Sequence, residues 1–222
     1  PGSSLSAGSQ AITATATDTA GNTSSASSSL DITIQYVMSD RAELDTAVAA
    51  WIADEAAATS IYGDINTWDV SAITDFSNLF EDRNTFNSDI SSWDVSSGTN
   101  FNSMFNGAEQ FDQDIGSWDV SSVTNFERMF REASAFNQDI GSWDVGNGTT
   151  FKDMFREASA FNQDIGSWDV SSGTGFLGMF MDATSFNQDI RRWDVSSGTL
   201  FKVMFYRATL MQDNYGFSAT PT

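Results

Sequence analysis

Six tryptophans follow one another at intervals of 25 residues with no insertion or deletion, at Trp68, Trp93, Trp118, Trp143, Trp168 and Trp193. The letters around them recur too, since FNQDIGSWDV stands at 136–145 and again at 161–170. A fixed period of about 20–50 residues is typical of solenoids, in which each unit buries its apolar face only by stacking on its neighbours. The period therefore predicts a stack of six units over residues 62–211.

The composition excludes several classes of function. Thirty acidic against ten basic residues give a formal net charge of −20, which repels nucleic-acid phosphates and anionic membrane surfaces. The chain has no Cys and no His, so it lacks thiolate metal ligands and the usual general base. Only oxygen-ligated cations such as calcium or magnesium remain. With no apolar run of about 18 residues, we expect neither nucleic-acid binding nor membrane insertion.

The pattern inside each repeat predicts one short helix and one short strand. An apolar stripe at i, i+3, i+4 and i+7 is typical of a helix, and in one repeat it consists of Phe151, Met154, Phe155 and Ala158. Thr149 is a candidate N-cap for that helix. Apolar residues at positions 1, 4 and 6 are typical of a leucine-rich-repeat strand, and here they are Ile140, Trp143 and Val145. The expected fold class is thus an α/β solenoid, with a parallel sheet on one face and helices on the other.

The segments outside the repeats have patterns of their own. Residues 1–36 are rich in Ser, Thr and Ala and predict two strands around a loop. Residues 37–61 predict an amphipathic helix whose apolar stripe is Leu44, Val48, Trp51, Ile52 and Ala56. Placed just before the first repeat, this helix is expected to cover the open end of the core. Residues 212–222 are expected to form a cap or tail at the other end.

Two stretches resemble known families. The stretch TATATDTAGNTS at 13–24 resembles the end of a bacterial immunoglobulin-like repeat, found in tandem in large surface adhesins. The stretch FDQDIGSWDVSSVTNFERMF at 111–130 resembles the 25-residue repeat of the BspA-like family. These are leucine-rich-repeat-related surface proteins of bacteria and mycoplasmas. The resemblance implies a secreted or surface-anchored protein with an adhesive role.

One column of carboxylates repeats on the expected sheet face: Asp69, Asp94, Asp119, Asp144, Asp169 and Asp194. Strands in a sheet lie about 4.8 Å apart, and like charges directly opposite one another destabilise it. The Asp side chains either accept hydrogen bonds from nearby Ser hydroxyls, or share calcium ions between repeats, or bind a cationic or hydroxyl-rich ligand. All six are candidate calcium ligands.

The last two repeats depart from the others at positions expected to face solvent. Leu177, Met181, Leu200, Val203 and Tyr206 are apolar or aromatic where the first repeats are polar, and Arg191 and Arg192 stand where Gly and Ser stand in the repeats before. Either the tail covers this cluster or a partner does. The candidate ligand-binding residues are Asp119, Asp144, Asp169, Asp194, Arg192 and Tyr206.

The resemblances together imply a module of a bacterial surface adhesin, and we expect this module to be non-enzymatic. A repeating array gives every Asp the same surroundings, whereas acid–base catalysis by two carboxylates needs two different ones. The expected partner is an external protein, peptide or glycan on a host or neighbouring cell. The alternative is a rigid spacer, stiffened by calcium, without a ligand of its own.

Overall fold

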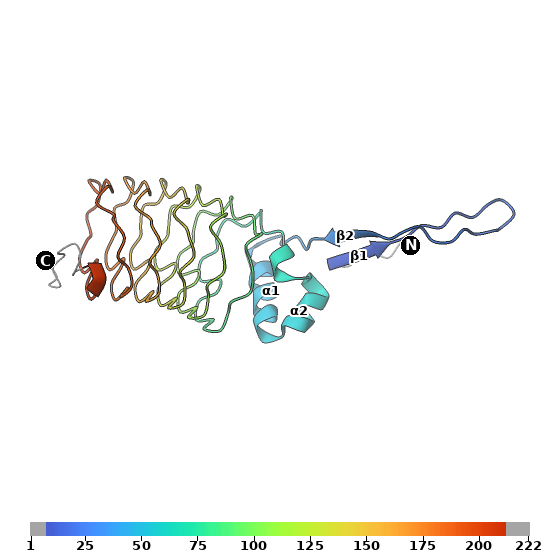
Figure 1. Ribbon diagram of the computed structural model, residues 1–222, viewed down its shortest axis with the longest axis horizontal. Coiled ribbons are helices and arrows are strands. Elements are labelled where there is room, and N and C mark those ends of the chain that lie inside the picture. Colours follow the sequence, from blue (N-terminus) through green and yellow to red (C-terminus); the bar gives the residue numbers. More distant parts are fainter. Residues whose placement is uncertain (1–7, 212–222) are drawn as a thin grey trace.

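The computed structural model describes residues 8–211. The molecule is elongated, with the repeats stacked along its length, two helices beside the first repeat and a hairpin arm pointing away from them (Figure 1). The core lies inside the stack and extends under the first helix.

The amino-terminal arm is a two-stranded antiparallel hairpin. Strand β1 (Gly8–Ile12) pairs with β2 (Leu30–Ile34). At the tip of the connecting segment, Asp18 Oδ1 accepts a hydrogen bond from the backbone N–H of Asn22 at 2.9 Å. The side chains of residues 11–30 are exposed, so this part of the arm adds nothing to the core.

Two helices stand between the arm and the repeats. Helix α1 (Arg41–Ala53) begins after Asp40, whose side chain accepts a hydrogen bond from the Glu43 N–H at 2.9 Å. Helix α2 (Glu55–Tyr62) begins after Asp54. The sequence predicts a single helix here, but Asp54 is extended and its side chain accepts from Ala57 N–H. A capping carboxylate therefore starts a new helix where the stripe alone suggests a continuation.

The predicted apolar stripe does not face inward along its whole length. Trp51 is buried, whereas Ile52 is 37% exposed and Ala56 is exposed as well. Trp51 packs edge-on against Trp68 at a ring distance of 5.9 Å, and its indole N–H donates to Ser88 Oγ at 2.9 Å. Helix α1 thus covers the first layer of the aromatic core. The short 3₁₀ turn η1 (Ile65–Thr67) comes after α2 in the chain.

The repeats contain neither the expected helix nor the expected strand. Within residues 68–208, all of which the structure describes, the chain forms successive turns and isolated bridges, with no α-helix and no extended strand. The strand-helix solenoid predicted from the sequence is therefore wrong. Each 25-residue unit is instead an irregular coil, which hydrogen-bonds to the next coil through backbone groups that include one parallel bridge, as between Thr150 and Gly175.

The residues of the predicted helical stripe, 151–158, have a backbone that is not helical. Asp153 and Glu157 have φ values of +52° and +61°, in the left-handed region, and such residues end a helix after one turn. The N–H of Met154 donates to Phe151 O at 3.2 Å in a turn, while the N–H of Phe155 donates to Met179 O of the next coil at 2.9 Å. Backbone hydrogen bonds between coils therefore take the place of the hydrogen bonds that a helix would form along its own axis.

The apolar residues point inward even though the elements differ. Ile140, Trp143 and Val145 are 0%, 4% and 1% exposed, although the Trp143 N–H donates to Ile140 O in a turn rather than across a sheet. Burial of the tryptophans is thus confirmed. Each indole N–H from the second repeat onward donates to an Ile carbonyl of the preceding coil, as Trp143 does to Ile115 O at 3.1 Å.

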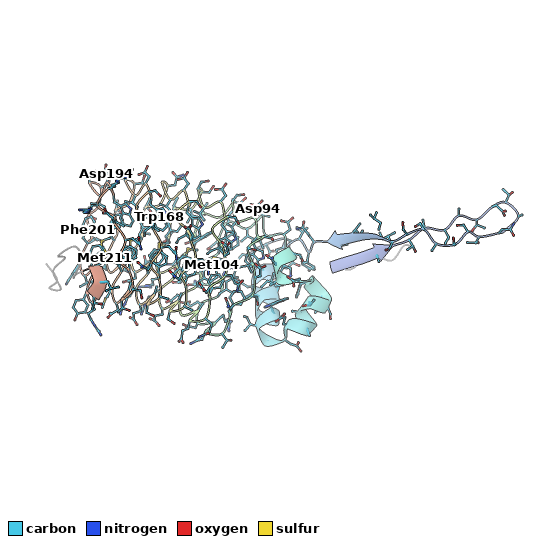
Figure 2. The ribbon with its side chains drawn as sticks, viewed as in Figure 1. Asp94, Met104, Trp168, Asp194, Phe201 and Met211 are labelled. Atoms are coloured by element: carbon cyan, nitrogen blue, oxygen red, sulfur yellow. The ribbon has the colours of Figure 1, made fainter. Side chains whose placement is uncertain are left out.

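Phenylalanine rings form ladders along the stack. Phe105, Phe130 and Phe155 stack nearly parallel at ring distances of 5.6 and 5.7 Å. Within one coil, Phe130 also stacks on Phe136 at 4.0 Å. Because each ring contacts the same ring one period away, the core is continuous, and its residues such as Met104 and Trp168 lie between the coil backbones (Figure 2).

Candidate functional site

The Asp column predicted as a calcium or ligand site lies along one edge of the stack, where Asp94 and Asp194 are labelled in Figure 2. Each of these carboxylates bonds within its own coil. Asp69 Oδ1 accepts from the backbone N–H and the hydroxyl of Ser71, at 3.0 and 2.6 Å. The same pair of bonds joins Asp119 to Ser121. These carboxylates therefore stabilise a turn within their own coil by accepting hydrogen bonds from it.

Hydrogen bonds from Ser residues also lower the pKa of several carboxylates in this column. The hydrogen bond from the Ser71 hydroxyl, followed by that from its backbone N–H, lowers the pKa of Asp69, and Ser121 does the same for Asp119. The pKa of Asp194 is lowered first by the Ser196 N–H, while Asp169 in the preceding coil opposes that effect. Among residues 8–211, no three acidic side chains come close enough together to hold a metal ion.

A second ladder of polar side chains joins the coils at the turn before the tryptophan. The N–H of Asn162 donates to Asn137 Oδ1 at 2.9 Å, and Gln163 Nε2 donates to the Asn137 carbonyl at 2.7 Å. Thr149, expected as a helix cap, has no helix to cap. Thr149 Oγ1 instead donates to the Thr124 carbonyl of the preceding coil at 3.0 Å, so both columns hold coils together.

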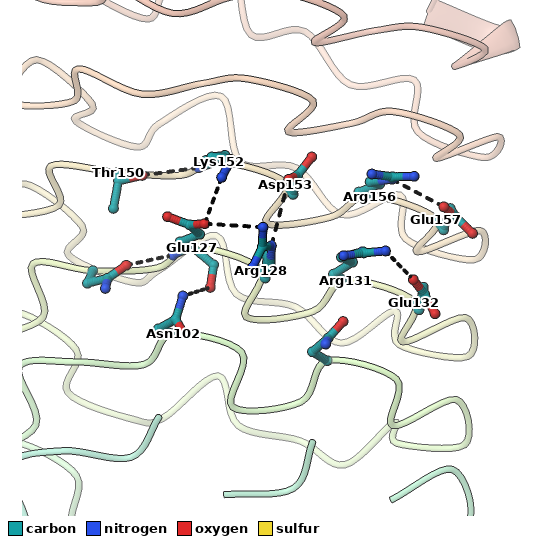
Figure 3. Close-up of polar contacts among 12 residues, drawn as sticks. Asn102, Glu127, Arg128, Arg131, Glu132, Thr150, Lys152, Asp153, Arg156 and Glu157 are labelled. Carbon is teal, nitrogen blue, oxygen red and sulfur yellow. Dashed lines mark hydrogen bonds and ion pairs between the residues drawn. The ribbon is translucent and has the colours of Figure 1, made fainter. Parts of the chain in front are cut away.

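Sequence reasoning missed a charged ladder on the middle coils (Figure 3). Lys152 Nζ lies 2.9 Å from Glu127 Oε1, one period away. Arg128 Nε lies 3.9 Å from Asp153, which is only 7% exposed, and Arg131 pairs with Glu132 at 2.7 Å. The signal was present, because opposite charges stand 25 residues apart at 127 and 152 and at 128 and 153.

The C-terminal end of the stack is the least covered part of the core. Leu200 and Phe201 are 53% and 39% exposed. An open pocket of about 340 Å³ lies at this end, lined mainly by Ile190, Trp193, Phe201 and Met204. Of the apolar and aromatic residues predicted to be exposed here, Leu177, Met181, Val203 and Tyr206 are half-buried.

The basic residues gather at the same end. Arg191 pairs with Asp189 at 2.7 Å, which holds the pKa of that carboxyl well below its usual range. Arg192 is exposed beside a second, polar hollow that Asp164 and Asp189 also line. Tyr206 lies further along the same coil, where its carbonyl accepts from the Asp182 N–H at 2.8 Å. Arg192 and Asp194 thus share one corner of the last coil, and the prediction that they bind a ligand stays a prediction.

The fold defines a repeat protein built from stacked 25-residue coils with a continuous aromatic core. The sequence model of the family described as "Mycoplasma protein of unknown function, DUF285" matches residues 49–160 and 141–219. The chain belongs to this family. No curated protein and no solved structure matches it. Among the described residues, no helix is long and apolar enough to cross a membrane.

Proposed function

We propose that the chain is a non-catalytic recognition module of a bacterial surface adhesin, which binds an external protein or peptide. The family match supports a repeat protein of the surface type, and the BspA-like and immunoglobulin-like resemblances of the sequence agree with an extracellular location. A glycan on a host or neighbouring cell is the other ligand class to test.

One observation carries the proposal: the last coil departs from an otherwise uniform array. Phe76, Phe101, Phe126, Phe151 and Phe176 are each 0% exposed, whereas the equivalent Phe201 is 39% exposed. Four of the ten basic residues, Arg191, Arg192, Lys202 and Arg207, also belong to this coil. An exposed aromatic and aliphatic patch next to cations is typical of a protein-recognition surface.

The second candidate is a rigid spacer stiffened by calcium. It is favoured by the uniformity of the Asp column and by the unbroken ring ladders, which transmit the same geometry from coil to coil. Calcium would need carboxylates that now close their own turns, such as Asp119 and Asp144. A spacer has no ligand, so the two candidates differ in a direct binding measurement.

The test is a peptide and glycan array probed with the purified chain, with calcium and with chelator. Binding of particular peptides, lost when Phe201 is changed to Ser, is the expected result. Binding to no peptide and no glycan, together with a melting temperature that rises with calcium, would favour the spacer.

A further inference from the structure

The coils have a direction along the stack in the segment that follows the parallel bridge. In each of the first five coils, alternate N–H groups donate to carbonyls of the next coil. In the fifth coil, Phe176 N–H donates to Leu200 O at 2.8 Å and Gly178 N–H to Lys202 O at 3.1 Å. Every coil therefore needs acceptors supplied from its C-terminal side, and offers acceptors on its N-terminal side.

The first coil shows how the protein covers an end of this ladder. Its carbonyls at Asp75 and Ser77 are equivalent, five periods earlier, to those of Leu200 and Lys202. No earlier coil donates to them. The guanidinium of Arg41 from α1 does so instead, with Nη1 at 2.8 Å from Asp75 O and Nη2 at 2.6 Å from Ser77 O. One cationic side chain thus replaces two backbone donors.

The last coil has the opposite requirement. The N–H groups of Phe201 and Val203, equivalent to those of Phe176 and Gly178, have no acceptor among residues 8–211. Phe201 also lines the open pocket of about 340 Å³, together with Ile190 and Trp193. Unused donors beside an apolar hollow can bind the carbonyls and one side chain of an extended partner segment, here at the edge of a coil and not of a β-strand.

Charge narrows the choice of occupant. Lys202 and Arg192 are exposed and form no ion pair within the described part of the chain, while the chain as a whole carries −20. A second copy that presents its own C-terminal end would set donors against donors and cations against cations, and the acceptors at its N-terminal end, Asp75 O and Ser77 O, already accept from Arg41. An occupant that brings backbone carbonyls and carboxylates satisfies both features at once.

We propose that the C-terminal end of the stack binds an extended, acidic segment of a partner protein. Its carbonyls accept from Phe201 and Val203, one apolar side chain enters the pocket beside Trp193, and its carboxylates pair with Lys202 and Arg192. This inference rests on the proposed recognition function and assigns it a site and a partner chemistry.

The probe is a set of acetylated, amidated heptapeptides with aspartate at alternate positions and leucine, phenylalanine or tryptophan between them. A matched set carries lysine in place of aspartate. Binding to the full chain is measured by fluorescence polarisation at low and high salt. We expect the acidic set to bind and the lysine set not to, with affinity falling as salt rises. Lys202→Glu should weaken binding by tenfold or more.

The control variant is Arg83→Glu, which makes the same charge change at an exposed residue of the first coil and should leave affinity unchanged. Amide exchange should slow at Phe201 and Val203 when peptide is added. Equal affinity for Lys202→Glu and Arg83→Glu, or no binding of any acidic peptide, would overturn this site. Binding of the lysine set that is lost with Asp119→Asn and Asp144→Asn would also overturn it, yet would leave the proposed recognition function standing.

Two other occupants give distinct results. If the Phe201 and Val203 amides are already protected in the free chain and lose protection when residues 212–222 are deleted, the chain covers its own end and the proposal fails. If protection rises with protein concentration, a second copy is the occupant, and the proposal fails likewise.

Discussion

Replacing Trp143 by Ala tests whether the aromatic interior holds the coils together. Trp143 lies in the fourth coil, is 4% exposed, and contacts Phe130 at a ring distance of 6.2 Å. A buried Trp removes roughly 150–250 Å² from water, which at about 25 cal/mol per Å² corresponds to about 4–6 kcal/mol. Since Ala keeps part of that area and the unfolded chain already buries some, we expect a loss of about 3–5 kcal/mol in the free energy of unfolding.

Trp143→Phe separates the hydrogen bond from the volume. It keeps most of the apolar contact but removes the indole donor, which lies 3.1 Å from the buried Ile115 carbonyl. An unsatisfied buried acceptor costs about 1–3 kcal/mol, so the Phe variant should fall between the Ala variant and the wild type.

The assay is urea unfolding followed by far-ultraviolet circular dichroism, with Ser142→Ala as the matched control. Ser142 is exposed and its hydroxyl donates to Gly116 O at 3.2 Å, so its loss should be about 1 kcal/mol or less. Trp193→Ala should cost less than Trp143→Ala, because Trp193 lies in the last coil and is 9% exposed. A Trp143→Ala loss no larger than that of Ser142→Ala would refute the packing argument.

The remaining predictions concern charge and capping. If adjacent Asp residues of the column share calcium, millimolar calcium should raise the melting temperature by the equivalent of about 2.7 kcal/mol per site at a hundredfold excess over Kd. The double change Asp119→Asn with Asp144→Asn should reduce this rise. A melting temperature that calcium leaves unchanged at constant ionic strength would mean that the column only closes turns. Hydrogen bonds from Ser39 and Tyr36 lower the pKa of Glu43 to about 2. The stability that ionised Glu43 contributes is therefore fully present above its ordinary pKa of 4.5 and is lost as pH falls toward 2. Glu43→Gln should flatten the pH dependence of the urea unfolding midpoint across that range. The bond to Glu43 raises the pKa of Tyr36 to about 12, so the same contact weakens as pH rises through 12. Arg41→Ala should cost about 1–3 kcal/mol by leaving Asp75 O and Ser77 O without donors, and Arg41→Lys should restore only part of it, as thermal melts would show.

The sequence alone determined the period and the membership of the core. Ile140, Trp143, Val145 and Phe155 are apolar in every copy or nearly so, and each is buried. That inference holds because a position repeated at a fixed interval meets the same neighbours in every layer, whatever backbone carries it. The sequence equally predicted that the columns of charged residues lie on the surface.

Only the tertiary structure decided the path of the backbone between these residues. The stripe from Phe151 to Ala158 suits a helix, yet it suits a row of turns just as well, because both place i, i+3, i+4 and i+7 on one side. Hydrogen-bond partners in the next coil decide between the two, such as Met179 O, which accepts from Phe155 N–H 24 residues earlier. A local pattern contains no information about such a partner.

The same reason limits what the sequence could say of the candidate sites. The Asp column was visible, but its bonds to Ser two residues later, as at Asp69 and Ser71, depend on a turn that only the folded coil forms. The apolar cluster at the C-terminal end was visible too. The unused N–H groups of Phe201 and Val203 were not, because a backbone donor is free or occupied only by virtue of the coil stacked beside it.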